Sequence, residues 1–188
     1  MRDGSGTRRK IHQAALRLFV DKGVAEATVR DLAQAAGIAE GTLYRHYASK
    51  DALVVDLFAT NYAAFARRLE AVHAPFPDFR AKLHAIVADL CRFFDDNPTL
   101  FRFLLLVQHQ VLPRMADDGD NPVEVVQRTV AAAIARDEIT VTDPALATAM
   151  VMGLVLQPAV AMVYGRLDPP FGRYAASIAD ACWRALHP

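Results

Sequence analysis

Residues 28–50 of the chain read TVRDLAQAAGIAEGTLYRHYASK, and this pattern predicts two short helices joined by a tight turn. Thr28 is a favourable N-cap for the first helix, and Asp31 is spaced to complete a capping box with it. Gly37 stands where a helix ends in a left-handed residue, a conformation that glycine adopts without steric cost. A second short helix is expected over residues 39–47. The stretch is therefore predicted to form a helix-turn-helix.

The second of these helices is predicted to have two different faces. Leu43 and Tyr47 are four residues apart and are expected to pack inward. The opposite face carries small and hydrogen-bonding side chains, which suit a helix that enters the major groove of DNA. These side chains are Glu40, Gly41, Thr42, Tyr44, Arg45 and His46.

The charges of the chain are unevenly distributed. Over all 188 residues, 21 Lys and Arg balance 21 Asp and Glu. Residues 1–50 carry 9 basic and 5 acidic side chains (+4), whereas residues 51–188 carry 12 and 16 (−4). A basic amino-terminal end suits a protein that contacts phosphate with that end only. Three cations, Arg8 to Lys10, lie at the expected start of the first helix, where positive charge is unfavourable. Phosphate would compensate their charge; the alternative is a solvated basic tail.

The rest of the chain is predicted to be helical around a sizeable core, because 53% of the residues are hydrophobic and 22% are charged. Residues 1–6 are expected to be a disordered leader. Ser49 opens a long helix, and later helices begin where proline follows a capping residue. The prediction is an all-α protein of about nine helices, with a helix-turn-helix DNA-binding domain over residues 1–50 and a helical ligand-binding and dimerisation domain over residues 51–188.

Residues 145–164 contain no charged side chain and are long enough to span a bilayer. Gln157, Pro158 and many small residues argue against a membrane span. A helix that is apolar all round also suits the interior of a soluble protein or a subunit interface, and this interpretation is favoured. Because no signal-like segment opens the sequence, the chain is expected to be cytoplasmic and to have no membrane partner.

The spaced residues of the first 54 positions resemble the amino-terminal domain of the tetracycline-repressor (TetR) family. The resemblance is carried by Ile11-x-x-Ala14-Ala15-x-x-Leu18-Phe19, Thr28-Val29-x-x-Leu32-Ala33-x-x-Ala36-Gly37-Ile38 and Gly41-Thr42-Leu43-Tyr44-x-His46-Tyr47-x-x-Lys50. It implies a homodimeric, ligand-responsive transcriptional regulator, most often a repressor, bound to a double-stranded DNA operator. The alternative is a helical small-molecule- or partner-binding protein whose helix-turn-helix is not used on DNA.

Positions matching the family imply roles for individual residues. Thr28, Tyr44, His46 and Lys50 match phosphate-contacting positions, with partial burial as the alternative for the two aromatic residues. Many members have serine where this chain has Ala39. The predicted DNA-binding set is Thr28, Arg30, Ala39, Glu40, Gly41, Thr42, Tyr44, Arg45, His46 and Lys50.

Three of these residues have side chains suited to base edges. Arg30 can recognise guanine O6 and N7, with a solvated surface arginine as the alternative. Thr42 can offer a methyl group to thymine or a hydroxyl to phosphate. Glu40 can accept from cytosine N4, with selection against other DNA sites as the alternative. Tyr47 replaces the usual phenylalanine of the family and is interpreted as a core residue.

Aromatic, methionine and amide side chains of the second domain suit a small, mainly apolar effector. The alternative for each of them is plain core packing. The predicted lining residues are Tyr62, Phe65, Phe94, Phe101, Leu104, Leu105, Gln108, His109, Met150, Leu154 and Gln157.

The last two long helices carry more apolar surface than one subunit readily hides, which predicts a two-fold interface. Trp183 is the expected anchor. The predicted dimer residues are Met150, Val151, Leu154, Tyr174, Ile178, Cys182 and Trp183.

No catalytic motif is present: the sequence lacks GxSxG, a P-loop, a dinucleotide-binding glycine fingerprint and HExxH. The histidines are scattered, and Cys91 and Cys182 lack metal-ligand spacing and are interpreted as buried free thiols. No enzymatic activity, catalytic residue, metal ion or cofactor is expected.

Overall fold

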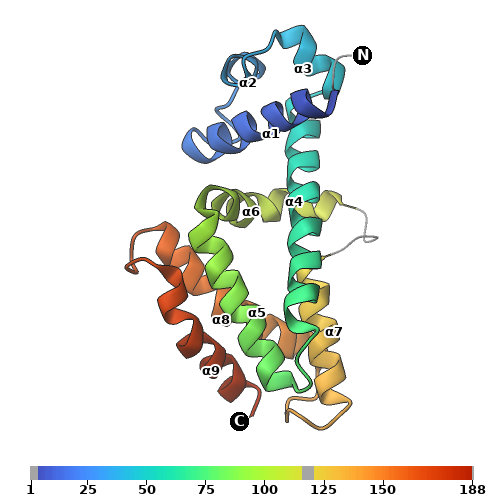
Figure 1. Ribbon diagram of the computed structural model, residues 1–188, viewed down its shortest axis with the longest axis vertical. Helices are drawn as coiled ribbons and strands as arrows, with labels where there is room; N and C mark the ends of the chain where they lie inside the picture. The colour runs from blue at the N-terminus through green and yellow to red at the C-terminus, as the bar shows by residue number, and fades with distance from the viewer. Residues whose placement is uncertain (1–3, 116–120, 188) are drawn as a thin grey trace. The chain divides into compact units, whose positions relative to one another are not determined.

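The computed structural model describes residues 4–115 and 121–187 (Figure 1). This part of the chain forms nine α-helices and two short 3-10 helices without any strand, which confirms the all-α prediction. The helices are α1 (Gly4–Asp21), α2 (Val29–Ala36), α3 (Glu40–His46), α4 (Lys50–His73), α5 (Phe79–Asp96), α6 (Pro98–Val111), η1 (Leu112–Arg114), α7 (Pro122–Ile134), α8 (Pro144–Val163), η2 (Phe171–Tyr174) and α9 (Ala175–Ala185).

Internal contacts divide the chain into two compact units. The head unit comprises Met1–Asn61 and Thr99–Asp117, and the body unit comprises Tyr62–Pro98 and Asp118–Pro188. The head unit is therefore discontinuous in sequence, since it includes most of α6. The sequence predicted a functional boundary after residue 50, whereas the compact units divide the chain at other positions. A division by contacts does not test a division by function, so this boundary stays a prediction.

Both ends of α2 are fixed by local chemistry. The Thr28 hydroxyl accepts from the Asp31 N–H at 3.1 Å, and the Asp31 carboxylate accepts from the Thr28 N–H at 3.0 Å, which confirms the capping box. At the other end, Gly37 is left-handed with φ 64°, and Ile38 N–H closes the helix by donating to the Ala33 carbonyl. The tight turn between α2 and α3 follows from this geometry.

Side-chain caps also begin several later helices. Ser49 caps α4 and Asp78 caps α5, each by accepting from a backbone N–H three residues later. Asn121 and Asp143 cap α7 and α8, with proline as the first helical residue of each. These boundaries confirm the sequence interpretation.

One boundary prediction requires correction, and one helix start departs from the pattern of a proline after a capping residue. Helix α1 begins at Gly4, so residues 4–6 are helical and are not part of a disordered leader; residues 1–3 lie outside the described part of the chain. The prolines of Asp168-Pro169-Pro170 precede the 3-10 helix η2, and α9 starts only after it, at Ala175.

Apolar side chains from α1, α2, α3, α4 and α6 form the core of the head unit. Leu32, Leu43 and Leu53 are at most 1% exposed. Phe19 of α1 stacks on Phe103 of α6, with ring centroids 6.1 Å apart. Burying one such side chain contributes about 2 kcal/mol to stability. Helix α6 is therefore held to α1 inside this unit.

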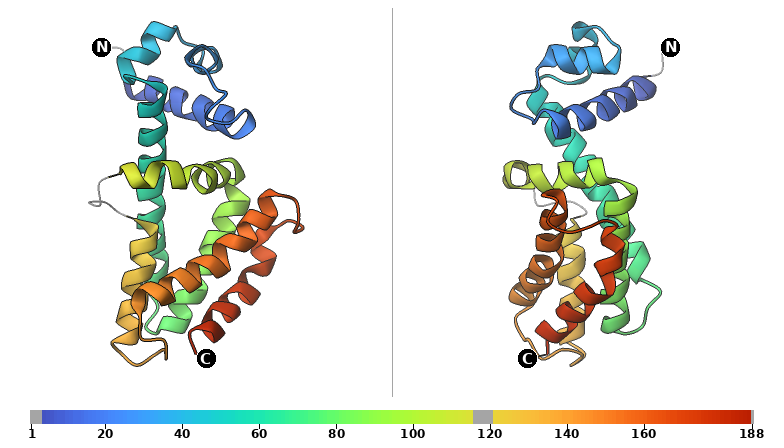
Figure 2. Two further views of the ribbon diagram at one scale, coloured as in Figure 1. Left: turned by 180° about the vertical axis from the view of Figure 1, so that it is seen from behind. Right: turned by 90° about the vertical axis from the view of Figure 1, so that its left-hand side faces the viewer.

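The body unit packs its helices in pairs, α5 along α9 and α7 along α8 (Figure 2). A partly buried ion pair lies within it: the Arg68 guanidinium donates to both carboxylate oxygens of Asp89 at 2.7 and 2.8 Å. The Asp95 carboxylate accepts from the backbone N–H groups of Phe171 and Gly172 at 2.7 and 2.8 Å, which fixes η2 against α5.

Helix α8 is the one helix of the described chain that is long and apolar enough to cross a membrane by length and composition. Only 28% of its apolar window is buried inside the chain. Leu146, in the first turn of α8, is 54% exposed, and Tyr164, which directly follows the helix, is 63% exposed. The side chains of α8 therefore leave an apolar face uncovered.

Both cysteines are buried and free, as predicted. Burial raises the pKa of the Cys91 thiol to about 12 and that of Cys182 to about 11. Since the thiolate is the reactive species, we expect negligible reaction with a thiol-specific chromogenic disulfide at pH 8 in the native protein. Both thiols should react within the mixing time after unfolding in guanidinium; rapid reaction of the native protein would contradict the assignment.

Candidate nucleic-acid interface

Helix α3 turns its predicted DNA-facing side chains outward. Leu43 and Tyr47 are 0% and 6% exposed, which confirms that they pack inward. Tyr44, on the opposite face, is 53% exposed. Among the other predicted residues, Ala39, Glu40, Gly41 and Arg45 are exposed, and Thr42 and His46 are half-buried.

Two details of α3 concern its individual residues. Ala39 precedes the helix without any side-chain cap, so the hydroxyl that many TetR-like sequences place there has no substitute. Arg45 donates from Nη2 to the Thr42 hydroxyl oxygen at 2.9 Å. This hydrogen bond ties the two side chains together on the exposed face of the helix.

At the start of α2, Thr28 and Arg30 are both exposed. The Thr28 oxygen is used as the N-cap, but its hydroxyl proton remains available to a phosphate acceptor. Arg30 has no hydrogen bond or ion pair to any other described residue. Its guanidinium is free to meet a base or a phosphate.

Lys50 is placed differently from the sequence prediction. Its ammonium donates to the carbonyls of Val24, Ala25 and Ala27 at 2.7, 3.1 and 2.8 Å. These bonds use all three donors of the group, so Lys50 holds the loop that leads directly into Thr28. The sequence did not predict this anchoring, and the contact of Lys50 with phosphate stays a prediction.

Lys50→Met should remove the loop anchor and leave three carbonyls without their charged donor. We expect a loss of about 2 kcal/mol in the free energy of unfolding, because hydrogen bonds to charged groups contribute more than neutral ones. DNA affinity should fall alike for all sequences. Urea unfolding and DNA titration check this, with Lys22→Met as a charge-matched control; equal stabilities of the two variants would contradict it.

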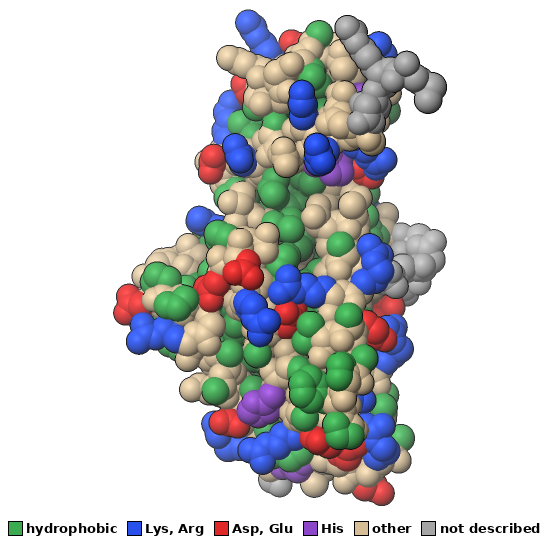
Figure 3. Space-filling view, in the orientation of Figure 1, with side chains coloured by type: hydrophobic (Ala, Val, Ile, Leu, Met, Phe, Trp, Pro, Cys, Tyr) green, Lys and Arg blue, Asp and Glu red, His purple; other side chains and the backbone are tan. Residues whose placement is uncertain are grey.

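The basic end of α1 also differs from expectation. Because α1 begins at Gly4, Arg8 lies in its second turn, and the Asp56 carboxylate compensates its charge. Arg9 and Lys10 are exposed and have no charged partner among the described residues. Figure 3 shows Lys and Arg side chains spread over this end of the molecule. Two of the three cations are therefore left without a charged partner in this part of the structure, and their contact with phosphate stays a prediction.

A polar cluster around Asp56 was not found from the sequence. Tyr47 donates from its hydroxyl to Asp56 at 2.8 Å, and His12 Nε2 lies 2.9 Å from the same carboxylate oxygen. Tyr47 is thus a core residue, as predicted, but its hydroxyl has a second role. The one feature of the sequence that could have indicated this cluster is Tyr47 itself, because TetR-like sequences usually have phenylalanine at that position.

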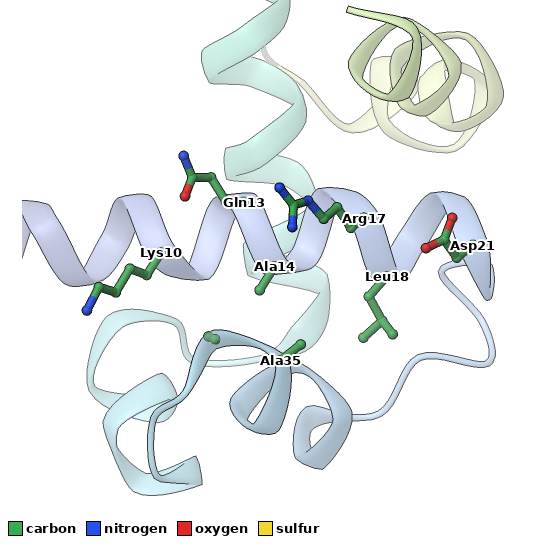
Figure 4. A pocket seen from close by; sticks show the side chains of 8 residues that line it. Lys10, Gln13, Ala14, Arg17, Leu18, Asp21 and Ala35 are labelled. Carbon is green, nitrogen blue, oxygen red and sulfur yellow. The ribbon is translucent and has the colours of Figure 1, made fainter.

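A surface groove of about 390 Å³ lies between α1 and α2 (Figure 4). Small and apolar side chains form its floor, and Lys10, Gln13 and Arg17 stand at its rim. The full lining is Lys10, Gln13, Ala14, Arg17, Leu18, Asp21, Ala35 and Ala36. The sequence predicted no such groove.

The sequence that forms capped α2, the turn after Gly37 and exposed α3 matches that of a known protein family. Residues 11–57 match the model described as bacterial regulatory proteins of the tetR family. The amino-terminal region is a TetR-family domain. The resemblance inferred from the spaced residues is thereby confirmed.

Curated relatives match about half of this chain. The transcriptional repressor KstR2 of Rhodococcus jostii is 36% identical over 83 residues, which are 44% of this chain and 41% of that protein. The putative mycofactocin biosynthesis transcriptional regulator MftR of Mycobacterium tuberculosis is 37% identical over 99 residues, 51% and 48% of the two chains. The chain thus spans less than half the length of these relatives. Both are regulators, in agreement with the prediction that this chain is not an enzyme.

Solved structures share the fold along the whole chain. The fatty acid degradation regulator FadR from Bacillus halodurans superposes with a TM-score of 0.83 and 18% identity, covering 100% of both chains. FadR from Bacillus subtilis, solved in complex with stearoyl-CoA, gives 0.80 and 18% identity over 95% of this chain and 99% of that one. At this identity the likeness shows the fold alone.

The predicted effector residues of this TetR-like chain are distributed over both units. In the head unit, Phe101, Leu104 and Leu105 are buried and Gln108 donates to the Leu105 carbonyl at 3.1 Å, whereas His109 is exposed. An exposed imidazole lines no closed cavity within its unit. The ligand-binding role of His109 stays a prediction.

In the body unit, several predicted effector residues pack on other aromatic rings. Phe65 stacks on Phe93 with centroids 4.8 Å apart, and Phe94 contacts Phe171 at 5.1 Å. Burial raises the pKa of Tyr62 to about 12. The last three, Met150, Leu154 and Gln157, lie on α8, where the first two are half-buried and Gln157 is exposed.

The predicted dimer residues divide into two groups. Val151, Ile178 and Cys182 are 2%, 7% and 0% exposed, so they pack inside the subunit and provide no dimer surface. Trp183 lies against Phe79, with centroids 6.4 Å apart, which uses part of the expected anchor internally. Met150, Leu154 and Tyr174 remain half-buried.

No group of three or more potential metal ligands occurs among His, Cys, Asp and Glu side chains within residues 4–115 and 121–187.

Proposed function

We propose that the chain is a cytoplasmic, homodimeric transcriptional regulator, a repressor that binds a pseudo-palindromic DNA operator and is released by a small, mainly apolar effector. The observation that carries this proposal is the exposed α3 face. Glu40, Tyr44 and Arg45 on this face are exposed, while Leu43 on the opposite face is completely buried. A short helix with such a face, rigidly backed, suits the major groove.

Base recognition is assigned to side chains at the start of α2 and α3. Gly41 lets the backbone approach base edges closely, and Glu40 accepts from cytosine N4. Arg30 has its guanidinium free for guanine. Thr28 and Tyr44 supply hydroxyl donors for phosphate, which fix the position of the domain on the duplex.

We assign the dimer interface to the exposed face of α8, on which a second copy of the chain would pack. Leu146, Ala149, Gly153 and Gln157 follow each other at helical spacing and are all exposed, and Tyr164 continues the same row. No charged residue occurs over residues 145–164. Pairing this face across a two-fold axis buries its apolar surface and presents two α3 helices to two half-sites.

Release by an effector requires that it bind the DNA-free arrangement of the dimer better than the DNA-bound one. The apolar and aromatic character of the predicted lining residues supports a mainly apolar compound. Long-chain acyl-CoA belongs in the first panel of candidates, because the same fold is known with stearoyl-CoA in the Bacillus subtilis structure.

Selection from a random DNA library with the full-length protein tests the proposal. We expect enrichment of a two-fold symmetric sequence, bound with an affinity that falls steeply as the salt concentration rises. Enrichment of a single unrepeated half-site would overturn the dimer. If no sequence is enriched, the chain does not regulate transcription through specific DNA binding, and the helical ligand- or partner-binding alternative gains support.

A further inference from the structure

A carboxylate in the head unit joins three of its elements. Asp56 of α4 receives Arg8 and His12 from α1 and Tyr47, the residue that ends α3. Arg8 Nη2 contacts one carboxylate oxygen, while the Tyr47 hydroxyl and His12 Nε2 share the other at 2.8 and 2.9 Å. Arg8 also donates from Nε to the Tyr47 oxygen at 3.0 Å.

The geometry defines the protons of this cluster. His12 Nε2 lies 2.7 Å from the Tyr47 oxygen and 2.9 Å from the carboxylate, so this nitrogen must carry a proton to face two acceptors. Burial raises the pKa of Asp56, but hydrogen bonds from Arg8, Tyr47 and His12 outweigh it and hold the pKa below its ordinary value. Burial, reinforced by Asp56, raises the pKa of Tyr47 to about 12. At neutral pH the carboxylate is therefore charged and the phenol is a donor.

The cluster is not needed to fill the core. Leu43 and Leu53 close the adjacent core at 0% exposure, and a phenylalanine at position 47 would fill the same space as the tyrosine ring. The Asp56 side chain is 27% exposed, and partly exposed ion pairs contribute little to stability. What the cluster adds is a fixed orientation of the helices that it joins, because hydrogen bonds are strongly angle-dependent.

We propose that Asp56 is a positioning residue for DNA binding. Through Tyr47 it fixes the carboxyl end of α3, and through Arg8 and His12 it fixes the basic end of α1. Helix α3 and the free cations Arg9 and Lys10 then approach the duplex in one fixed relation. The inference rests on the proposed function, since it explains how the head unit holds its DNA-contacting parts.

Asp56→Asn tests the inference, with Asp51→Asn as the matched control. Both changes remove one negative charge from α4, but among the described residues the Asp51 carboxylate pairs with Arg114 and not with Arg8, His12 or Tyr47. On the operator selected by the wild-type protein, we expect Asp56→Asn to bind about tenfold more weakly. Asp51→Asn should bind at least as well as the wild type, because each variant gains the same long-range attraction to phosphate.

The salt dependence separates positioning from simple loss of stability. If Arg9 and Lys10 lose their phosphate contacts, the slope of log K against log salt should decrease in magnitude by about 1 to 2 for each subunit of the bound Asp56→Asn dimer. A smaller folded fraction would lower affinity without changing that slope. Thermal unfolding followed by circular dichroism confirms that each variant is folded at the assay temperature.

Tyr47→Phe is a second variant that tests the same inference. It keeps the aromatic ring in the core, so it can be used even if Asp56→Asn does not fold. It should weaken operator binding severalfold, and the effects of the two changes should be less than additive in the double variant. Wild-type affinity and slope in Tyr47→Phe, or an Asp56→Asn variant that behaves like Asp51→Asn, would overturn the inference. Absence of any selective binding by the wild type would instead refute the proposed function.

Discussion

Gly41→Asp is expected to abolish specific DNA binding, by about 100-fold or more, and to leave the fold intact. A carboxylate placed at the leading end of α3 would meet the phosphates and acceptor-rich base edges, and such like-charge contacts cost several kcal/mol. Competitive titration of the selected operator against random DNA measures the effect.

The fold should tolerate this change for two reasons. A Cβ added at Gly41 meets no atom within 4 Å, and the residue needs no left-handed backbone. An acidic side chain in the first turn of a helix is also favourable. Gly41→Ala serves as the steric control and should bind more strongly than the aspartate variant. Near-normal operator binding by Gly41→Asp would remove α3 from the DNA interface.

Gly153→Arg is expected to separate the proposed dimer into monomers. Within one subunit an added Cβ at Gly153 also meets nothing within 4 Å, so folding should be preserved. Across the two-fold axis, however, a long cation would be buried in an apolar face without a partner, which is strongly unfavourable. Sedimentation velocity should show the monomer.

The same variant should lose about 100-fold or more in operator affinity, since two linked half-site contacts bind far more tightly than one. Gln127→Arg, an exposed change of equal charge on α7, is the control and should stay dimeric. A dimeric Gly153→Arg protein would show that another face pairs the subunits. Trp183→Ala, by contrast, should mainly destabilise the subunit, because the indole lies against Phe79.

Much of the fold could be predicted because the ends of its helices are determined locally. A capping residue accepts from N–H groups two or three positions later, so Thr28, Asp78 and Asn121 can be recognised from sequence alone. Gly37 is recognisable for the same reason, since its left-handed backbone needs only glycine.

The residues that were missed or misplaced depend on contacts between distant positions. Lys50 donates to carbonyls 23 to 26 residues away, and Asp56 gathers partners up to 48 residues away. No local pattern encodes such pairs. Helix α8 posed a different problem: because it is apolar on all sides, periodicity gave no way to tell that Val151 points inward and Gly153 outward.

The discontinuity of the head unit has a practical consequence for biosensor engineering by domain exchange. A single crossover after residue 50 would transplant Phe19 without Phe103, and Arg8 and His12 without Asp56. The transplanted module would carry an exposed aromatic ring and an incomplete core. Chimaeras built from this chain should therefore use two donor segments, residues 1–61 and 99–117, so that the module arrives with its own α6.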